Sequence, residues 1–181
     1  PIDLHLSALE KLGAKIDPRE DGIFVTGERL SGADVHLLFP SVGATENVLM
    51  AGAAAKGTTR IFGAAKEPEI QTLCDFLNRL GAKVCGIGTD VLTVEGKRTF
   101  QDVEFTVPGD RIVAGTYLAA CMCAGGRIFL KDAPCGQMES VFACARKLGV
   151  RLSPSQEGLY VEGRACRRLD ENLVTAVYPG F

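Results

Sequence analysis

The feature that most constrains this chain is an internal repeat. Three gap-free segments resemble one another: residues 9–16, 77–84 and 145–152. Each contains a leucine followed by a glycine, and these leucines, Leu12, Leu80 and Leu148, lie 68 residues apart in both steps. An isolated α/β unit of this length leaves apolar faces that a neighbouring unit must cover. The repeat therefore predicts several copies of one unit.

The order of elements within the middle copy predicts a mixed α/β fold. Hydrophobic periodicity indicates helices at residues 45–56 and 68–80, and Pro68 suits the first turn of the second helix. The expected strands are residues 58–62, 82–86, 91–95 and 103–107. A strand before the first helix, the two helices and the first three of these strands make a βαβαββ unit, and residues 103–107 precede the next helix. Because the first copy is present only from its second helix, residues 4–12, the chain holds about two and a half units.

Composition and charge exclude several classes of partner. The formal charge is −2 and the charged residues, 23% of the chain, are interspersed in sign, so we expect no nucleic acid as a partner. The longest apolar stretch, residues 117–124, is far shorter than the roughly 20 residues that cross a bilayer, so we expect no membrane partner. The sequence starts at Pro1 with neither an initiator Met nor a signal peptide, and we interpret this start as a position inside a longer chain.

The seven cysteines favour a reducing, cytoplasmic location. Their number is odd and none forms a Cys-x-x-Cys motif. Cys121 and Cys123 could ligate a metal, but neither of the two histidines lies near them in sequence. We favour small buried hydrophobes for these two residues and expect no metal.

Two segments have the form of an anion site. Residues 41–45 place a glycine-containing turn before a helix, where backbone N–H groups can receive a phosphate, although Thr45 would also serve as an ordinary N-cap. The equivalent place in the next unit has Asp110 and Arg111. An Asp at a helix start suits a cap with a solvated neighbour as well as it suits a site.

Further candidates are acidic or imidazole side chains. Glu67 and Glu69 flank Pro68 in the first turn of a helix, where the helix dipole stabilises negative charge. Two carboxylates at this spacing could also do acid–base work. His5 lies on a short helix, either as a site residue or as a partly buried structural one.

Eight motifs together carry a resemblance to one family: residues 1–6, 41–45, 57–59, 64–70, 86–90, 108–112, 114–116 and 178–181. In this order and spacing they resemble the enolpyruvyl transferases, and within them the bacterial UDP-N-acetylglucosamine 1-carboxyvinyltransferase family, over essentially the full chain. The resemblance implies repeated units of the inverse α/β-barrel fold, arranged as two globes of three units. It implies that residues 1–109 belong to the catalytic globe and residues 110–181 to the second globe.

The resemblance also implies roles for individual residues. Four would line a uridine pocket: Pro1, Ile2, Asp3 and Leu4. Three match a loop that contacts the diphosphate: Ser41, Val42 and Gly43. Four would lie near a cleft between the globes: Glu67, Asp110, Arg111 and His5. Two departures stand out, since Phe39 replaces a basic residue of some members and Val113 replaces a Glu. Phe39 and Pro40 would still pack on the uracil.

The implied activity is transfer of the enolpyruvyl group of phosphoenolpyruvate to the 3-hydroxyl of UDP-N-acetylglucosamine, in peptidoglycan synthesis, with no organic cofactor. None of the seven cysteines matches the family's catalytic cysteine, and the family's catalytic aspartate is not matched either. We therefore expect an internal fragment that is inactive alone and that self-associates through exposed repeat faces. Two alternatives remain, a transferase acting on shikimate 3-phosphate and a non-catalytic repeat protein of the same fold.

Overall fold

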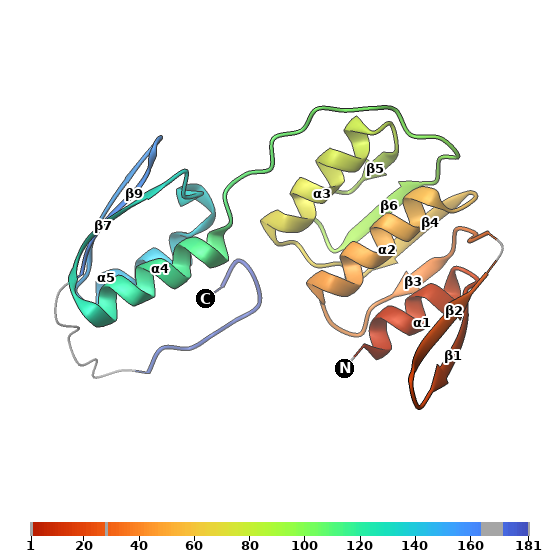
Figure 1. Ribbon diagram of the computed structural model, residues 1–181, viewed down its shortest axis with the longest axis horizontal. Coiled ribbons are helices and arrows are strands. Elements are labelled where there is room, and N and C mark those ends of the chain that lie inside the picture. The colour runs from red at the N-terminus through yellow and green to blue at the C-terminus, as the bar shows by residue number, and fades with distance from the viewer. Residues whose placement is uncertain (1, 28, 164–171, 181) are drawn as a thin grey trace. The chain divides into compact units, whose positions relative to one another are not determined.

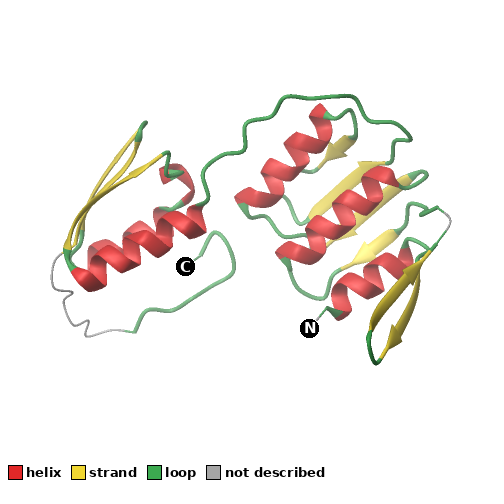
Figure 2. Ribbon diagram, in the orientation of Figure 1, coloured by secondary structure: helices red, strands yellow, loops and turns green. Residues whose placement is uncertain are grey.

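The computed structural model describes residues 2–27, 29–163 and 172–180. It divides into two compact units, Pro1–Phe105 and Thr106–Phe181. In the first unit, helices cover one face of a β-sheet (Figures 1 and 2). The predicted assignment of residues 1–109 and 110–181 to two globes of a larger enzyme stays a prediction.

The first unit contains a hairpin, a four-stranded sheet and a layer of helices. Its elements are α1 (Asp3–Lys11), β1 (Lys15–Arg19), β2 (Gly22–Thr26), β3 (Asp34–His36), α2 (Val42–Ala54), β4 (Thr58–Phe62), α3 (Pro68–Arg79), β5 (Lys83–Cys85) and β6 (Val91–Glu95). Strands β1 and β2 form the antiparallel hairpin. The larger sheet has the order β3-β4-β6-β5, in which only the β3–β4 pair is parallel.

The second unit repeats this plan with a smaller sheet. Its elements are α4 (Arg111–Ala124), β7 (Gly126–Lys131), the 3₁₀ turn η1 (Cys135–Gln137), α5 (Glu139–Lys147), β8 (Arg151–Ser155) and β9 (Gly158–Gly163). The sheet order is β7-β9-β8, antiparallel throughout. Helix α4 packs on β7 and β9, and α5 packs on β8. Their shared core contains Phe142 and Met138, both fully buried.

Helix α2 is the centre of the first unit. It lies between α1 and α3 and above β4 and β6, and it contributes six buried residues to the core. Val48, Leu49 and Ala53 on α2 are fully buried against Ile61 and Leu92 of the sheet. Alternate residues of β4 and β6 point into this core and the others point outward, as expected for a sheet with one covered face. This packing holds the three helices in one parallel layer (Figure 1).

The predicted βαβαββ unit is confirmed in the order β3-α2-β4-α3-β5-β6. The strand predicted at residues 103–107 is wrong, because the structure has no strand within 101–110. An alternating apolar pattern forms a strand only where a ladder partner is in reach. Here Phe105 instead packs edge-on against Phe76 of α3, with ring centroids 5.3 Å apart, and lies under the guanidinium of Arg79.

Candidate ligand site at the helix N-termini

Helices α1, α2 and α3 all begin at the same end of the helix layer of the first unit (Figure 1). A hydrogen bond links the starts of α2 and α3. The Thr45 hydroxyl, in the first turn of α2, accepts from the backbone N–H of Ala65 at 3.1 Å, just before α3. Motifs that are far apart in the sequence therefore share one edge of the unit.

The first turn of α2 is capped by Ser41. Its Oγ accepts from the N–H of Ala44 at 3.3 Å, and the Thr45 hydroxyl donates to the Ser41 carbonyl at 2.7 Å. The helix thus begins at Val42, three residues before the predicted start, and Thr45 is not its N-cap. The N–H groups of Val42 and Gly43 have no acceptor within the helix, because the first turn has no preceding carbonyls. They form the positive end of the helix dipole.

His5 lies against this turn. Its Nδ1 is 2.6 Å from the side-chain nitrogen of Asn47, one turn further along α2. A Cβ atom on Gly43 would stand only 3.2 Å from the His5 Cε1 and 3.6 Å from Nε2, so the glycine lets the ring approach the backbone. His5 and Asn47 are both half-buried. The structure therefore brings together His5 and the predicted loop of Ser41, Val42 and Gly43.

At the start of α1 and in the loop before α2, most side chains are exposed to solvent and one packs on the core. Ile2 is the N-cap residue of α1 and is half exposed, and Asp3 is exposed in the first turn. Leu4 instead packs on the apolar core, so it supports the site rather than facing solvent. Pro1 lies outside the described residues. Just before Ser41, Phe39 is 59% exposed and Pro40 is exposed as well.

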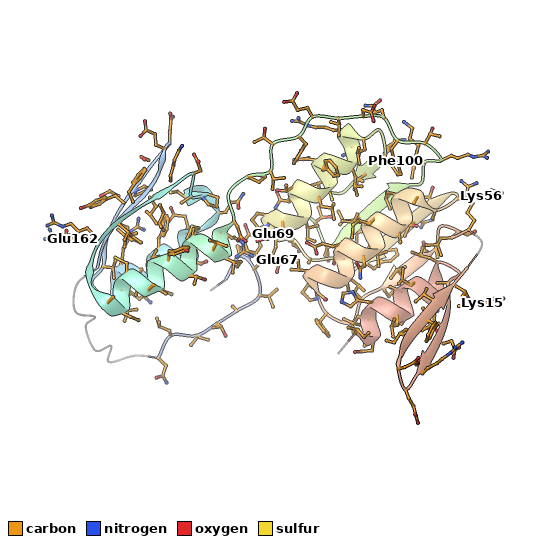
Figure 3. All side chains as sticks on the ribbon, viewed as in Figure 1. Lys15, Lys56, Glu67, Glu69, Phe100 and Glu162 are labelled. Carbon is orange, nitrogen blue, oxygen red and sulfur yellow. The ribbon has the colours of Figure 1, made fainter. Side chains whose placement is uncertain are left out.

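Glu67 and Glu69 stand at the start of α3 (Figure 3). Glu67 occupies the N-cap position, and its carboxylate forms no capping hydrogen bond to the described backbone. Pro68 is buried at the first helical position, as predicted. Glu69 lies in the first turn and is half-buried. Both carboxylates are therefore held at the positive end of α3, where the helix dipole stabilises their charge.

Asp110 and Arg111 belong to the second unit, where each has a local partner. The Asp110 carboxylate caps α4, accepting from the N–H of Ile112 at 2.6 Å and of Val113 at 3.2 Å. The Arg111 guanidinium lies 5.4 Å from the centroid of the Tyr178 ring. A cavity of about 350 Å³ opens between the start of α4 and the end of β7, and Asp110 and Tyr117 are among its lining residues. The cap was one of the two predicted roles of Asp110.

The described cysteines act as packing groups or surface thiols. Burial, reinforced by the charge of Asp75, raises the pKa of the Cys74 thiol to about 11, so it is not a nucleophile at neutral pH. Cys121 is buried, as predicted, and donates to the Gly126 carbonyl at 3.7 Å. The predicted burial of Cys123 is wrong, because this residue is exposed on α4. Within the described ranges, His, Cys, Asp and Glu side chains nowhere gather in threes as a metal site requires. The same ranges contain no helix long and apolar enough to span a membrane.

Sequence reasoning missed Asn47. The residue is a polar side chain near the start of a largely apolar helix, and it follows Gly43 by four positions, which places both on one helix face. That pattern was a usable signal. Its partner, His5, lies 42 residues away in sequence, so only the packing of α1 on α2 reveals the pair.

Comparison with known proteins gives relatives over the whole chain. The family model described as EPSP synthase (3-phosphoshikimate 1-carboxyvinyltransferase) matches residues 1–181. The UDP-N-acetylglucosamine 1-carboxyvinyltransferase of Solidesulfovibrio magneticus is 41% identical over 181 residues, which is 100% of this chain and 43% of that protein. The second such enzyme of Caldanaerobacter subterraneus is 40% identical with the same coverage. The chain thus spans a little under half the length of the curated relatives it matches.

Solved structures share the fold. The enolpyruvyl transferase NikO of Streptomyces tendae matches with a TM-score of 0.77 at 21% identity, covering 99% of this chain and 46% of that one. An EPSP synthase of Acinetobacter baumannii matches with a TM-score of 0.65 at 19% identity, covering 90% and 40%. These likenesses confirm the predicted fold class. With the relatives above, they show that the chain belongs to the enolpyruvyl transferase family.

Proposed function

We propose that this chain is the sugar-nucleotide-binding part of a bacterial UDP-N-acetylglucosamine 1-carboxyvinyltransferase. The whole enzyme would transfer the enolpyruvyl group of phosphoenolpyruvate to the 3-hydroxyl of UDP-N-acetylglucosamine in the cytoplasm. This reaction commits the sugar to peptidoglycan, and so serves cell-wall synthesis, cell shape and division. The observation that carries the proposal is the packing of His5 against the first turn of α2. The named relatives at 40–41% identity support the substrate class.

The first turn of α2 suits the diphosphate. Phosphate oxygens accept hydrogen bonds, and the N–H groups of Val42 and Gly43 are donors without acceptors inside the helix. The helix dipole also favours the negative charge of a phosphate at this helix start. Ser41 holds the turn in place through its bond to Ala44, so the donors are oriented before the ligand arrives.

The uridine end would rest on the segments beside this turn. Phe39 is 59% exposed two residues before Ser41, and an exposed aromatic ring can stack on a base. Stacking would replace the charge contact of those relatives that carry a basic residue there. The exposed Asp3 carboxylate on α1 offers a hydrogen-bond acceptor to the base.

Glu67 and His5 are the groups of the first unit that could face the reacting end of the substrates. Both are half-buried at the shared edge of the helix layer. By the resemblance, the family's catalytic cysteine is not among the seven here, and the buried Cys74 thiol is too weak an acid to replace it. We therefore propose that the isolated chain binds the sugar nucleotide and does not turn over. Phosphate released from phosphoenolpyruvate by the purified chain would contradict this.

The rival substrate is shikimate 3-phosphate, which the description of the matching family model favours. Isothermal titration distinguishes the two substrates. We expect UDP-N-acetylglucosamine to bind and to resist displacement by shikimate 3-phosphate. Binding of shikimate 3-phosphate alone would assign the chain to the sister reaction, and binding of neither compound would favour a non-catalytic repeat protein.

A further inference from the structure

We propose that Asn47 is a positioning residue of this site, which holds His5 in the tautomer that carries its proton on Nε2. The proposal rests on the proposed function for the identity of the ligand, but the arrangement of the side chains is independent of it. The first turn of α2 would then present three donors, the N–H groups of Val42 and Gly43 and the Nε2–H of His5, and so favour a group that accepts hydrogen bonds.

The contact between Asn47 and His5 sets the tautomer. The amide nitrogen of Asn47 lies 2.6 Å from Nδ1 of the ring, and an amide nitrogen can only donate. A ring nitrogen that accepts a hydrogen bond carries no proton. A neutral imidazole ring carries one N–H proton, and this proton must then be on Nε2. Without this contact, either ring nitrogen of His5 could carry the proton.

The position of Gly43 shows where Nε2 points. A Cβ at Gly43 would lie 3.6 Å from Nε2 and 3.2 Å from Cε1, so this edge of the ring faces the second residue of α2. The N–H groups of Val42 and Gly43 emerge from the same turn. Nε2–H therefore adds a side-chain donor to the backbone donors. An oxygen of a phosphate group, which is an acceptor, matches all of them.

Asn47 itself does not need to touch the ligand. It lies one turn beyond Gly43 on α2, and its amide nitrogen contacts the other ring nitrogen of His5, Nδ1. Its effect on affinity would pass through His5. A substitution that replaces the donor at residue 47 by an acceptor of similar size should therefore move the ring proton of His5 to Nδ1. Nε2 would then be an acceptor.

The test is Asn47→Asp. A carboxylate is close in size to the amide and only accepts, so it should draw the proton to Nδ1 and leave Nε2 as an acceptor. Long-range ¹H–¹⁵N correlation spectra at pH 8 report the tautomer directly. The chain has two histidines, and the His5→Gln variant identifies the signal of His5 by its loss. The other, His36, is stacked on Phe62 at 4.4 Å and should keep its spectrum in Asn47→Asp.

Binding is measured beside the spectra with two probes, UDP-N-acetylglucosamine and inorganic pyrophosphate. We expect Nε2–H in the unaltered chain, Nδ1–H in Asn47→Asp, and a loss of affinity for both probes of about tenfold or more. The control Met50→Asp puts the same charge at an exposed position one turn further along α2, and should cost much less affinity.

The outcomes separate the two proposals. If pyrophosphate binding depends on the tautomer but the sugar nucleotide does not bind, then the positioning role stands and the proposed function fails. The positioning role is overturned if His5 of the unaltered chain carries its proton on Nδ1. It is also overturned if Asn47→Asp changes neither the tautomer nor the pyrophosphate affinity, or if Met50→Asp weakens binding equally.

Discussion

Replacing Val42 by proline removes one hydrogen-bond donor from the proposed diphosphate site while leaving the helix intact. Val42 is the first residue of α2, where a proline is tolerated because its missing N–H has no partner in the helix. The residue before a proline must be extended, and Ser41 already has φ −86° and ψ 121°. The capping bond from Ala44 to Ser41 is untouched by the change.

The expected loss follows from the charge of the ligand. A hydrogen bond to a charged group contributes about 1.5–3 kcal/mol, so losing one donor should weaken binding about 10- to 150-fold. Val42 also packs partly on the core, so the substitution should lower the free energy of unfolding by about 1 kcal/mol. That cost is separate from the binding effect.

Isothermal titration with UDP-N-acetylglucosamine measures the binding effect, and circular dichroism with thermal unfolding checks the fold. The matched control is Val42→Ala, which loses the same packing but keeps the backbone N–H. It should bind nearly as tightly as the unaltered chain. If Val42→Pro is folded and binds as tightly as Val42→Ala, the backbone N–H of Val42 is not part of the site.

Three further predictions concern packing, thiol chemistry and assembly. Gly52→Ala should lower the free energy of unfolding by about 1–3 kcal/mol in a denaturant titration, because the new Cβ would lie 2.8 Å from Val94. The control Gly115→Ala, at a position of α4 with open space around it, should not lower the free energy of unfolding. At pH 8, iodoacetamide should label the exposed Cys85 and Cys123 well before Cys74, whose raised pKa keeps it protonated, and equal rates by mass spectrometry would contradict this. Because Ile112 and Tyr117 are each 59% exposed on α4, the chain should self-associate, and a clean monomer by light scattering at high concentration would count against that.

The periodic parts of the sequence predicted the fold well. Helix α3 and strands β4 and β6 lie where the pattern placed them, because Pro68, the glycine after Leu80 and the alternating strand residues act locally. The repeat also predicted the βαβαββ order. The spacing of the repeat is less regular in the strands than in the helices. The leucines at the helix ends are 68 residues apart, whereas the buried Leu92 of β6 and Leu159 of β9 are 67 residues apart. The second copy is therefore one residue shorter between its helix end and this strand.

The parts that depend on distant partners were not predictable from local patterns. Thr45 resembles an N-cap in the sequence, but its hydroxyl bonds Ala65 and the Ser41 carbonyl, and Ser41 caps the helix. Residues 103–107 have the alternation of a strand, but Phe105 packs on α3 instead. The pairing of Asn47 with His5 likewise arises from the packing of two helices. The resemblance could name candidate residues, whereas their contacts required the structure.

The most direct test of the proposed function is an amide NMR titration of the ¹⁵N-labelled chain with UDP-N-acetylglucosamine and, separately, with shikimate 3-phosphate. We expect the sugar nucleotide to shift the N–H signals of Val42 and Gly43, together with those around Phe39 and Asp3. Shikimate 3-phosphate should leave them unmoved. If UDP-N-acetylglucosamine does not shift the signals of Val42 and Gly43, the start of α2 is not the diphosphate site and the proposed function is contradicted.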